Sequence, residues 1–220
     1  FVIGISCWFL LKKRDKEFAV ASIKIGAVFG LVASLLTVWT GDGSGYAIAQ
    51  TQPMKLAAVE GYYEGQNGAG LVAVGLLNPE KKTYDDGQDP FLFRIEIPKM
   101  LSLLAERKVD AFVPGIKNII EGGYELKDGT KALSAAEKIE KGKKAIAALA
   151  TYRTAKKEGD EAAAKEAYTT LQENVPYFGY GYIKDVNQLV PNVPLNFYAF
   201  RVMVILGGYF ILFFILVLFF

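Results

Sequence analysis

Long apolar runs lie near the two ends of the sequence, and a mostly polar segment separates them. Residues 18–39 contain a single charged side chain, Lys24, and residues 197–220 contain only Arg201. Both runs exceed the roughly 20 residues that a helix needs to cross a bilayer. The pattern predicts an all-α membrane protein in which two transmembrane helices, 18–39 and 197–220, flank a long, mainly helical extracytoplasmic loop, 40–196.

A third apolar run covers residues 1–11 and is too short to span a membrane. It begins without Met, so we expect it to be the end of a truncated transmembrane helix and the chain to be a fragment. A cleaved signal peptide is the competing interpretation. Against it, the charges follow the apolar run, and no small-residue cleavage site is visible.

The connection at residues 12–17 reads K-K-R-D-K-E and holds four basic side chains. By the positive-inside rule this connection is cytoplasmic, which places the loop 40–196 outside. The loop carries 19 of the chain's 25 lysines and arginines and 21 of its 23 aspartates and glutamates. A net charge of about −2 without a basic stripe argues against nucleic-acid binding.

Within the loop, the pattern predicts a short amphipathic helix at 98–107 and a helical hairpin at about 134–174. Ser134 begins the sequence S-A-A-E, a capping box, while Gly159 ends the first helix and Asp160 caps the second. We expect the charged faces of this hairpin to be solvated surface. Binding of a protein partner is the alternative.

Several kinds of site are excluded or disfavoured. The chain has no histidine, which excludes histidine-dependent nucleophile pairs and histidine metal sites within it, and its single Cys7 can form no internal disulfide. The glycine-rich stretch 40–46 suggests a loop of close approach, but it lacks the G-K-[ST] of a phosphate loop. The sequence D-D-G-Q-D at 85–89 lacks the ligand spacing of a calcium loop and favours a turn.

Lys55 and Glu60 are candidates for chemistry at the outer membrane surface. A partly desolvated Glu60 would bind a proton more tightly and could act as a base. Five residues on a helix correspond to about 140° of rotation, so the two side chains should diverge unless a ligand lies between them. From spacing alone, a surface helix with ordinary charges is the stronger interpretation.

Arg201 and Met203 are the unusual residues of the last span. A thioether inside the membrane could be an axial ligand of haem iron, and an arginine in a span is a functional candidate by default. The alternatives are a packing methionine and an arginine that extends to the interface.

Three separated motifs resemble subunit I of the cytochrome bd quinol oxidases. They are T-G-D-G-S-G-Y at 40–46, Q-P-M-K-L-A-A-V-E-G at 52–61 and F-R-V-M at 200–203. F-R-I-E-I-P at 93–98, R-K-V-D at 107–110 and G-Y-G-Y at 179–182 are also similar to the external quinol loop of that subunit. The resemblance covers nearly the whole chain, in the same order and topology.

The resemblance implies roles for the candidate residues. Lys55 and Glu60 correspond to residues of quinol binding and oxidation, Met203 to an axial ligand of a low-spin b haem, and Arg201 to a neighbour of that haem. It implies a quinol:oxygen oxidoreductase in the bacterial cytoplasmic (inner) membrane. The implied partners are membrane quinol, the remainder of subunit I, subunit II and the lipid bilayer.

The chain also departs from the family pattern. The histidine that would complete the low-spin haem has no counterpart here, nor do the ligands of the high-spin haems b and d or the G-R-Q-P-W segment. We therefore expect this chain alone to be inactive. A second interpretation is a non-catalytic membrane-anchored module whose external helical hairpin binds a protein partner.

Overall fold

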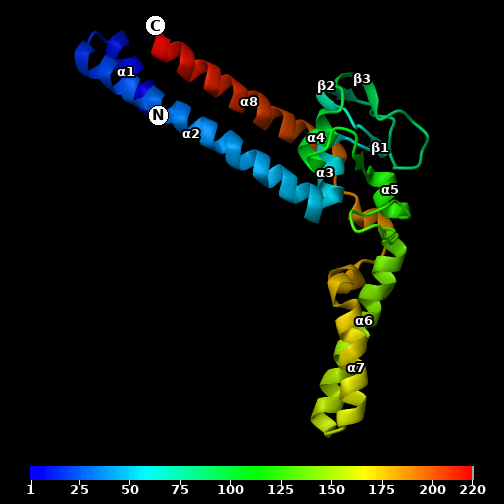
Figure 1. The fold of residues 1–220 in the computed structure, drawn as a ribbon. Helices are drawn as coiled ribbons and strands as arrows, with labels where there is room; N and C mark the ends of the chain where they lie inside the picture. Colours follow the sequence, from blue (N-terminus) through cyan, green and yellow to red (C-terminus); the bar gives the residue numbers. More distant parts are fainter. Residues whose placement is uncertain (220) are drawn as a thin grey trace.

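A computed structural model describes residues 1–219 and shows three apolar helices packed side by side. They are α1 (Val2–Leu11), α2 (Lys16–Thr51) and α8 (Val193–Phe219), which together form an arm (Figure 1). α2 and the segment Val186–Phe219 are long and apolar enough to cross a membrane by length and composition. Two candidate spans are thus present, and both contain the apolar runs of the sequence.

α2 continues beyond the apolar run, through the glycine-rich stretch, to Thr51. The prediction of a loop of close approach at residues 40–46 is therefore wrong, because Gly41, Gly43 and Gly45 lie within the helix. A Cβ at any of the three would have no atom within 4 Å, so no segment approaches closely there. Hydroxyl groups support this extension, since Ser44 and Thr51 donate hydrogen bonds to carbonyl oxygens four residues earlier. Arg107 also forms an ion pair with Asp42 on the extended part of α2.

A small mixed body follows the C-terminal end of α2. Its helices are α3 (Pro53–Glu60), α4 (Met100–Glu106) and α5 (Ile116–Glu121), so the short amphipathic helix expected at 98–107 is present as α4. Its strands form two antiparallel pairs, β1 (Gln66–Asn67) with β4 (Phe112–Val113) and β2 (Leu71–Leu77) with β3 (Phe91–Ile97). The mainly helical fold is confirmed, but the all-α expectation missed these strands, because their pairing joins segments up to about 47 positions apart that no local pattern links.

The predicted helical hairpin is confirmed as α6 (Ala135–Glu158) and α7 (Glu161–Asn174). The Ser134 hydroxyl accepts a hydrogen bond from the Glu137 amide and the Glu137 carboxylate accepts one from the Ser134 amide. Gly159 ends α6 in a left-handed conformation, and Asp160 caps α7. Two 3-10 helices, η1 (Val175–Tyr182) and η2 (Val186–Leu189), then lead back to α8.

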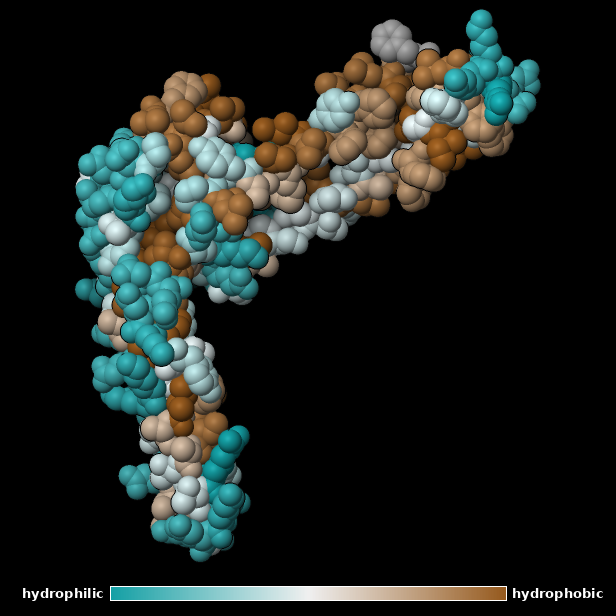
Figure 2. Space-filling model, turned by 180° about the vertical axis from the view of Figure 1, so that it is seen from behind, coloured by the Kyte–Doolittle hydropathy of each residue, from teal (hydrophilic) through white to brown (hydrophobic). Residues whose placement is uncertain are grey.

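The surface divides along the same lines. Apolar side chains cover much of the arm, whereas polar side chains dominate much of the α6–α7 hairpin, which projects away from the arm (Figures 1 and 2). Another apolar group lies on the mixed body, over the β2–β3 hairpin (Figure 2).

Candidate functional site: a buried carboxylate and arginine

The boundary between α2 and α3 places Lys55 and Glu60 beside the arm. Gln52 adopts an extended φ of −136°, and Pro53 begins α3. Proline restricts the residue before it and is well suited to a first helical turn, because it has no amide hydrogen to leave unpaired there. The chain therefore bends at Gln52, and α3 packs against α8 rather than extending α2.

Gly61 ends α3 and allows the core to close over Glu60. Its φ of +62° is a left-handed conformation that favours glycine. A Cβ at this position would lie 3.0 Å from Phe91 and 3.3 Å from Phe197, so a larger residue would also crowd both rings. Both the local backbone and the packing around it require a glycine next to Glu60.

Glu60 forms a buried ion pair with Arg201 of α8. The Arg201 Nη2 to Glu60 Oε2 distance is 2.6 Å, and a second contact joins Nη1 to Oε1 at 3.4 Å. The two residues are only 3% and 9% exposed. Two parallel contacts of this kind fix the relative orientation of a guanidinium and a carboxylate, so the pair joins α3 to α8 in one geometry.

Two opposing effects act on the pKa of the Glu60 carboxyl. Burial raises the pKa of the Glu60 carboxyl above its ordinary value, and the hydrogen bond and positive charge of Arg201 oppose that rise. Burial disfavours a charged group in a medium of low dielectric constant, whereas a paired cation favours it. A carboxylate held between these opposing effects can accept and release a proton.

The structure does not bring all four predicted site residues together. Lys55 is exposed on α3, and its side chain forms no hydrogen bond or ion pair with the described residues, 1–219. Met203 is 59% exposed, although it lies only two positions beyond the buried Arg201 on α8. The divergence of Lys55 from Glu60 follows their helical spacing, and so does that of Met203 from Arg201.

The partner of Glu60 is the feature that sequence reasoning missed. Lys55 is its neighbour in sequence, but Arg201 is its partner in space. The Arg201 side chain is only 11% exposed and turns toward Glu60 of α3. The signal available in the sequence was that Arg201 is the only charged residue in its span.

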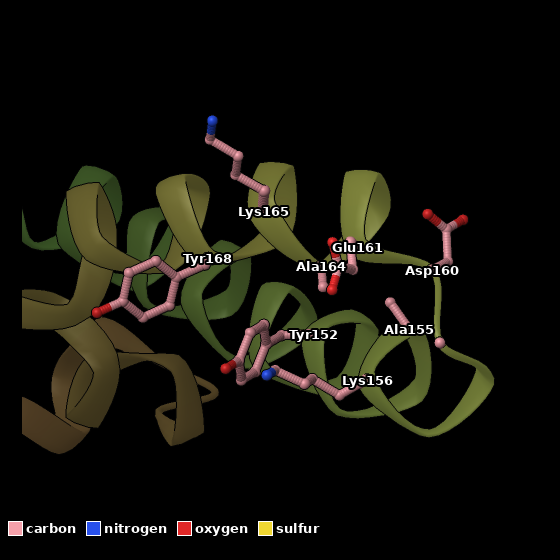
Figure 3. A pocket seen from close by; sticks show the side chains of 9 residues that line it. Tyr152, Ala155, Lys156, Asp160, Glu161, Ala164, Lys165 and Tyr168 are labelled. Atoms are coloured by element: carbon pink, nitrogen blue, oxygen red, sulfur yellow. The ribbon is translucent and has the colours of Figure 1, made fainter.

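Other candidate positions have structural explanations. The turn expected at 85–89 is confirmed, since Asp86 accepts hydrogen bonds from the Lys81 ammonium group and from three nearby amides. A pocket between α6 and α7 lies at the end of the helical hairpin, where Tyr152 and Tyr168 face each other with ring centroids 5.7 Å apart (Figure 3). Within residues 1–219, no cluster of three or more Cys, Asp or Glu side chains could hold a metal ion.

Comparison with known proteins then identifies the family. The sequence model of the family described as "Cytochrome bd terminal oxidase subunit I" matches residues 1–220. The chain belongs to this family. The resemblance inferred from the three motifs is therefore confirmed for cytochrome bd subunit I.

Curated relatives of cytochrome bd subunit I agree with this assignment. The chain is 31% identical over 226 residues to the cytochrome bd-II ubiquinol oxidase subunit 1 of Escherichia coli, covering 94% of this chain and 39% of that protein. It is also 31% identical to the cytochrome bd ubiquinol oxidase subunit 1 of Bacillus subtilis, over 54% of this chain and 24% of that protein. The chain thus spans well under half the length of these relatives.

One solved structure is also similar to this cytochrome bd family member. It is the bd oxidase from Geobacillus thermodenitrificans, at 19% identity and a TM-score of 0.46, covering 97% of this chain and 53% of that one.

Proposed function

We propose that this chain is part of the quinol-oxidising subunit of a bd-type terminal oxidase. The buried Glu60–Arg201 pair is the observation that carries the proposal, because it joins a membrane-spanning helix to a loop helix that presents a carboxyl of raised pKa. Family membership supplies the reaction class. In this reaction a membrane quinol loses two electrons and two protons at the outer face, and the intact enzyme reduces oxygen to water.

Glu60 and Lys55 take complementary parts in this proposal. The Glu60 carboxylate accepts a proton from a quinol hydroxyl, and Arg201 holds the carboxylate in place. Lys55 lies in the same short helix with its ammonium group exposed, where it can donate a hydrogen bond to the quinol. A base positioned within hydrogen-bond reach of the proton that it removes is the requirement for this step.

In this proposal the Met203 thioether would be a ligand that holds a low-spin b haem. The residues fit such a group in two respects. The Met203 thioether is exposed and therefore accessible to iron, and the buried Nε of Arg201 has no hydrogen-bond partner within residues 1–219. The bound haem would supply a one-electron acceptor for quinol oxidation, with its second ligand a histidine outside this chain. The high-spin haems b and d belong to other parts of the intact subunit.

The proposed location is the bacterial cytoplasmic membrane, with residues 12–17 inside and the quinol loop 40–196 outside. Residues 1–11 would end a preceding transmembrane helix, while 18–39 and 197–220 would form the apolar parts of the two spans. The remainder of subunit I, subunit II and the lipid bilayer would surround them. By itself this chain would be inactive, since the proposed haem needs a ligand from elsewhere.

Conservative substitutions in the intact complex test the proposal. Glu60→Gln should lower the rate of quinol oxidation by at least about tenfold, because loss of a positioned proton acceptor typically costs more than this. Lys55→Ala should also lower the rate, because it removes the proposed hydrogen-bond donor to the quinol. Haem content should remain near that of the unmodified complex. Glu64→Gln and Lys143→Ala change exposed residues of the same types and serve as matched controls. Unchanged turnover in both site variants would instead favour a membrane-anchored module without these catalytic residues.

A further inference from the structure

The β2–β3 hairpin has an exposed face made entirely of apolar side chains. In the antiparallel register, Val74 lies opposite Ile95 and Leu76 lies opposite Phe93. Residues directly opposite each other share a face of the sheet. These four side chains, together with Ile97, are between 43% and 56% exposed. We call them the outer face of the hairpin.

The opposite face of the hairpin already forms the core of this region. Val72, Leu77 and Phe91 are buried in one cluster with Phe197 of α8, and the Phe91 and Phe197 ring centroids are 5.6 Å apart. An antiparallel sheet that covers a core on one side and faces water on the other normally alternates apolar with polar residues. Here the exposed charged residues of β3, Arg94 and Glu96, lie on the face that covers the core, opposite Gly75 and Val72, so the outer face lacks the polar side chains of a solvated surface.

The position of the hairpin indicates what covers it. The Leu77 amide donates a 3.0 Å hydrogen bond to the Tyr198 hydroxyl, so the hairpin is tied to the first two turns of α8. Figure 1 shows the two strands beside the N-terminal end of α8, with their connecting loop projecting farther away. α8 belongs to a candidate membrane span, and its side chains Leu195 and Val202 near this end are also exposed and apolar.

We propose that the outer face of the β2–β3 hairpin contacts the outer leaflet of the lipid bilayer. In this arrangement the exposed apolar side chains of α8 and those of the outer face form adjoining surfaces. Lipid covers both surfaces. Apolar patches of this kind on a soluble surface mark an interaction site, and burial of aromatic and aliphatic side chains at the headgroup boundary is favourable. Lipid contact would hold α3, and with it Glu60, at a constant depth through Gly61 and Phe91.

This inference depends on α8 crossing the membrane and does not require quinol oxidation. Photocrosslinking in the intact complex, in its own membrane, tests it directly. The photoreactive residue p-benzoylphenylalanine replaces Phe93 in one variant and Ile95 in another. The matched control carries it in place of Tyr168, an exposed aromatic residue on α7. After irradiation, mass spectrometry of the digested subunit identifies what each position contacts.

The expected result is a mass shift equal to a phospholipid on the peptide that carries position 93 or 95, and no such shift at position 168. Crosslinks from both positions to another segment of the subunit, to a different subunit or to a second copy would overturn the proposal in favour of a protein contact. Yields of lipid adduct no higher than at position 168 would overturn it in favour of a solvated face. Activity measurements on the Glu60 and Lys55 variants are independent of each of these outcomes.

Discussion

Glu60 is buried because residues on three different elements surround it. α3 brings it to the N-terminal end of α8, Gly61 lets the rings of Phe91 and Phe197 approach, and Arg201 supplies the compensating charge. A buried ion pair gains little over a well-packed apolar pair, because both charges lose their hydration. At the scale of the residue, the pair therefore sets a specific geometry more than it adds stability.

Removal of one partner tests this interpretation of the ion pair. Arg201→Met should destabilise the complex by about 3–5 kcal/mol, because it leaves a buried carboxylate without its cation. The double variant Glu60→Leu with Arg201→Met should recover most of that loss. The measurement is the thermal unfolding of the intact complex, with the exposed Arg153→Met as a control. Additive losses in the double variant would contradict a direct coupling between the two side chains.

Met203 permits a spectroscopic test. Met203→Leu keeps a similar volume but removes the sulfur that the proposal assigns to haem iron. The low-spin haem band in the visible spectrum of reduced membranes should be lost or shifted, since axial ligands set the electronic state of the iron. Met100→Leu on α4 makes the same change away from α8. An unaltered low-spin spectrum in Met203→Leu would rule out this residue as the ligand.

At the scale of elements, the helical hairpin depends on one close contact with the segment that follows it. α6 packs against η1 where Gly142 meets Gly181, and a Cβ at Gly142 would overlap the backbone of Tyr177 and Gly181. The absence of a side chain at both glycines lets the two backbones touch. The return path to α8 is therefore held against α6 by backbone packing.

Gly142→Ala distinguishes two effects on stability, the packing of η1 against α6 and the intrinsic helix propensity of α6. Alanine favours a helix by about 1 kcal/mol over glycine. The overlap with η1 should still make the substitution unfavourable, by about 1–3 kcal/mol. Hydrogen exchange of the amides in residues 175–182 should become faster. Gly179→Ala within η1 has open space around it and should leave the exchange rates unchanged. Equal rates in both variants would show that the close contact is not required.

At the scale of the whole molecule, the arm and the mixed body form a continuous structure. α2 packs against α8, and a Cβ at Gly30 would lie 2.5 Å from the Phe214 ring. Small residues allow helices to approach closely in a membrane, where packing replaces the hydrophobic effect as the main source of association. The outer ends of both helices then meet α3, so the arrangement of the arm sets the position of Glu60.

Gly30→Ala should therefore weaken the whole assembly. The added methyl group has no room unless Phe214 moves, so the midpoint of thermal unfolding of the complex should fall. Gly43→Ala lies in the same helix with nothing within 4 Å of its Cβ, and it should leave the midpoint unchanged or raise it. The same fall in both variants would contradict a packing role for Gly30.

Local features of this protein could be predicted because they depend on neighbouring residues. The two apolar runs identify the spans by their length, and Ser134, Gly159 and Asp160 mark helix ends through bonds to amides and carbonyls within a few positions. The motifs at 40–46, 52–61 and 200–203 likewise identify the family without any knowledge of contacts.

The sequence by itself determined the two apolar spans, the helical hairpin and the family, because the interactions behind these features are short-range. Only the tertiary structure decided that Glu60 pairs with Arg201, 141 positions away, and that α2 continues through the glycine-rich stretch. It also decided which apolar runs pair as β2 and β3. These long-range contacts depend on how distant segments pack together. The free energy of that packing cannot be inferred from any local sequence pattern.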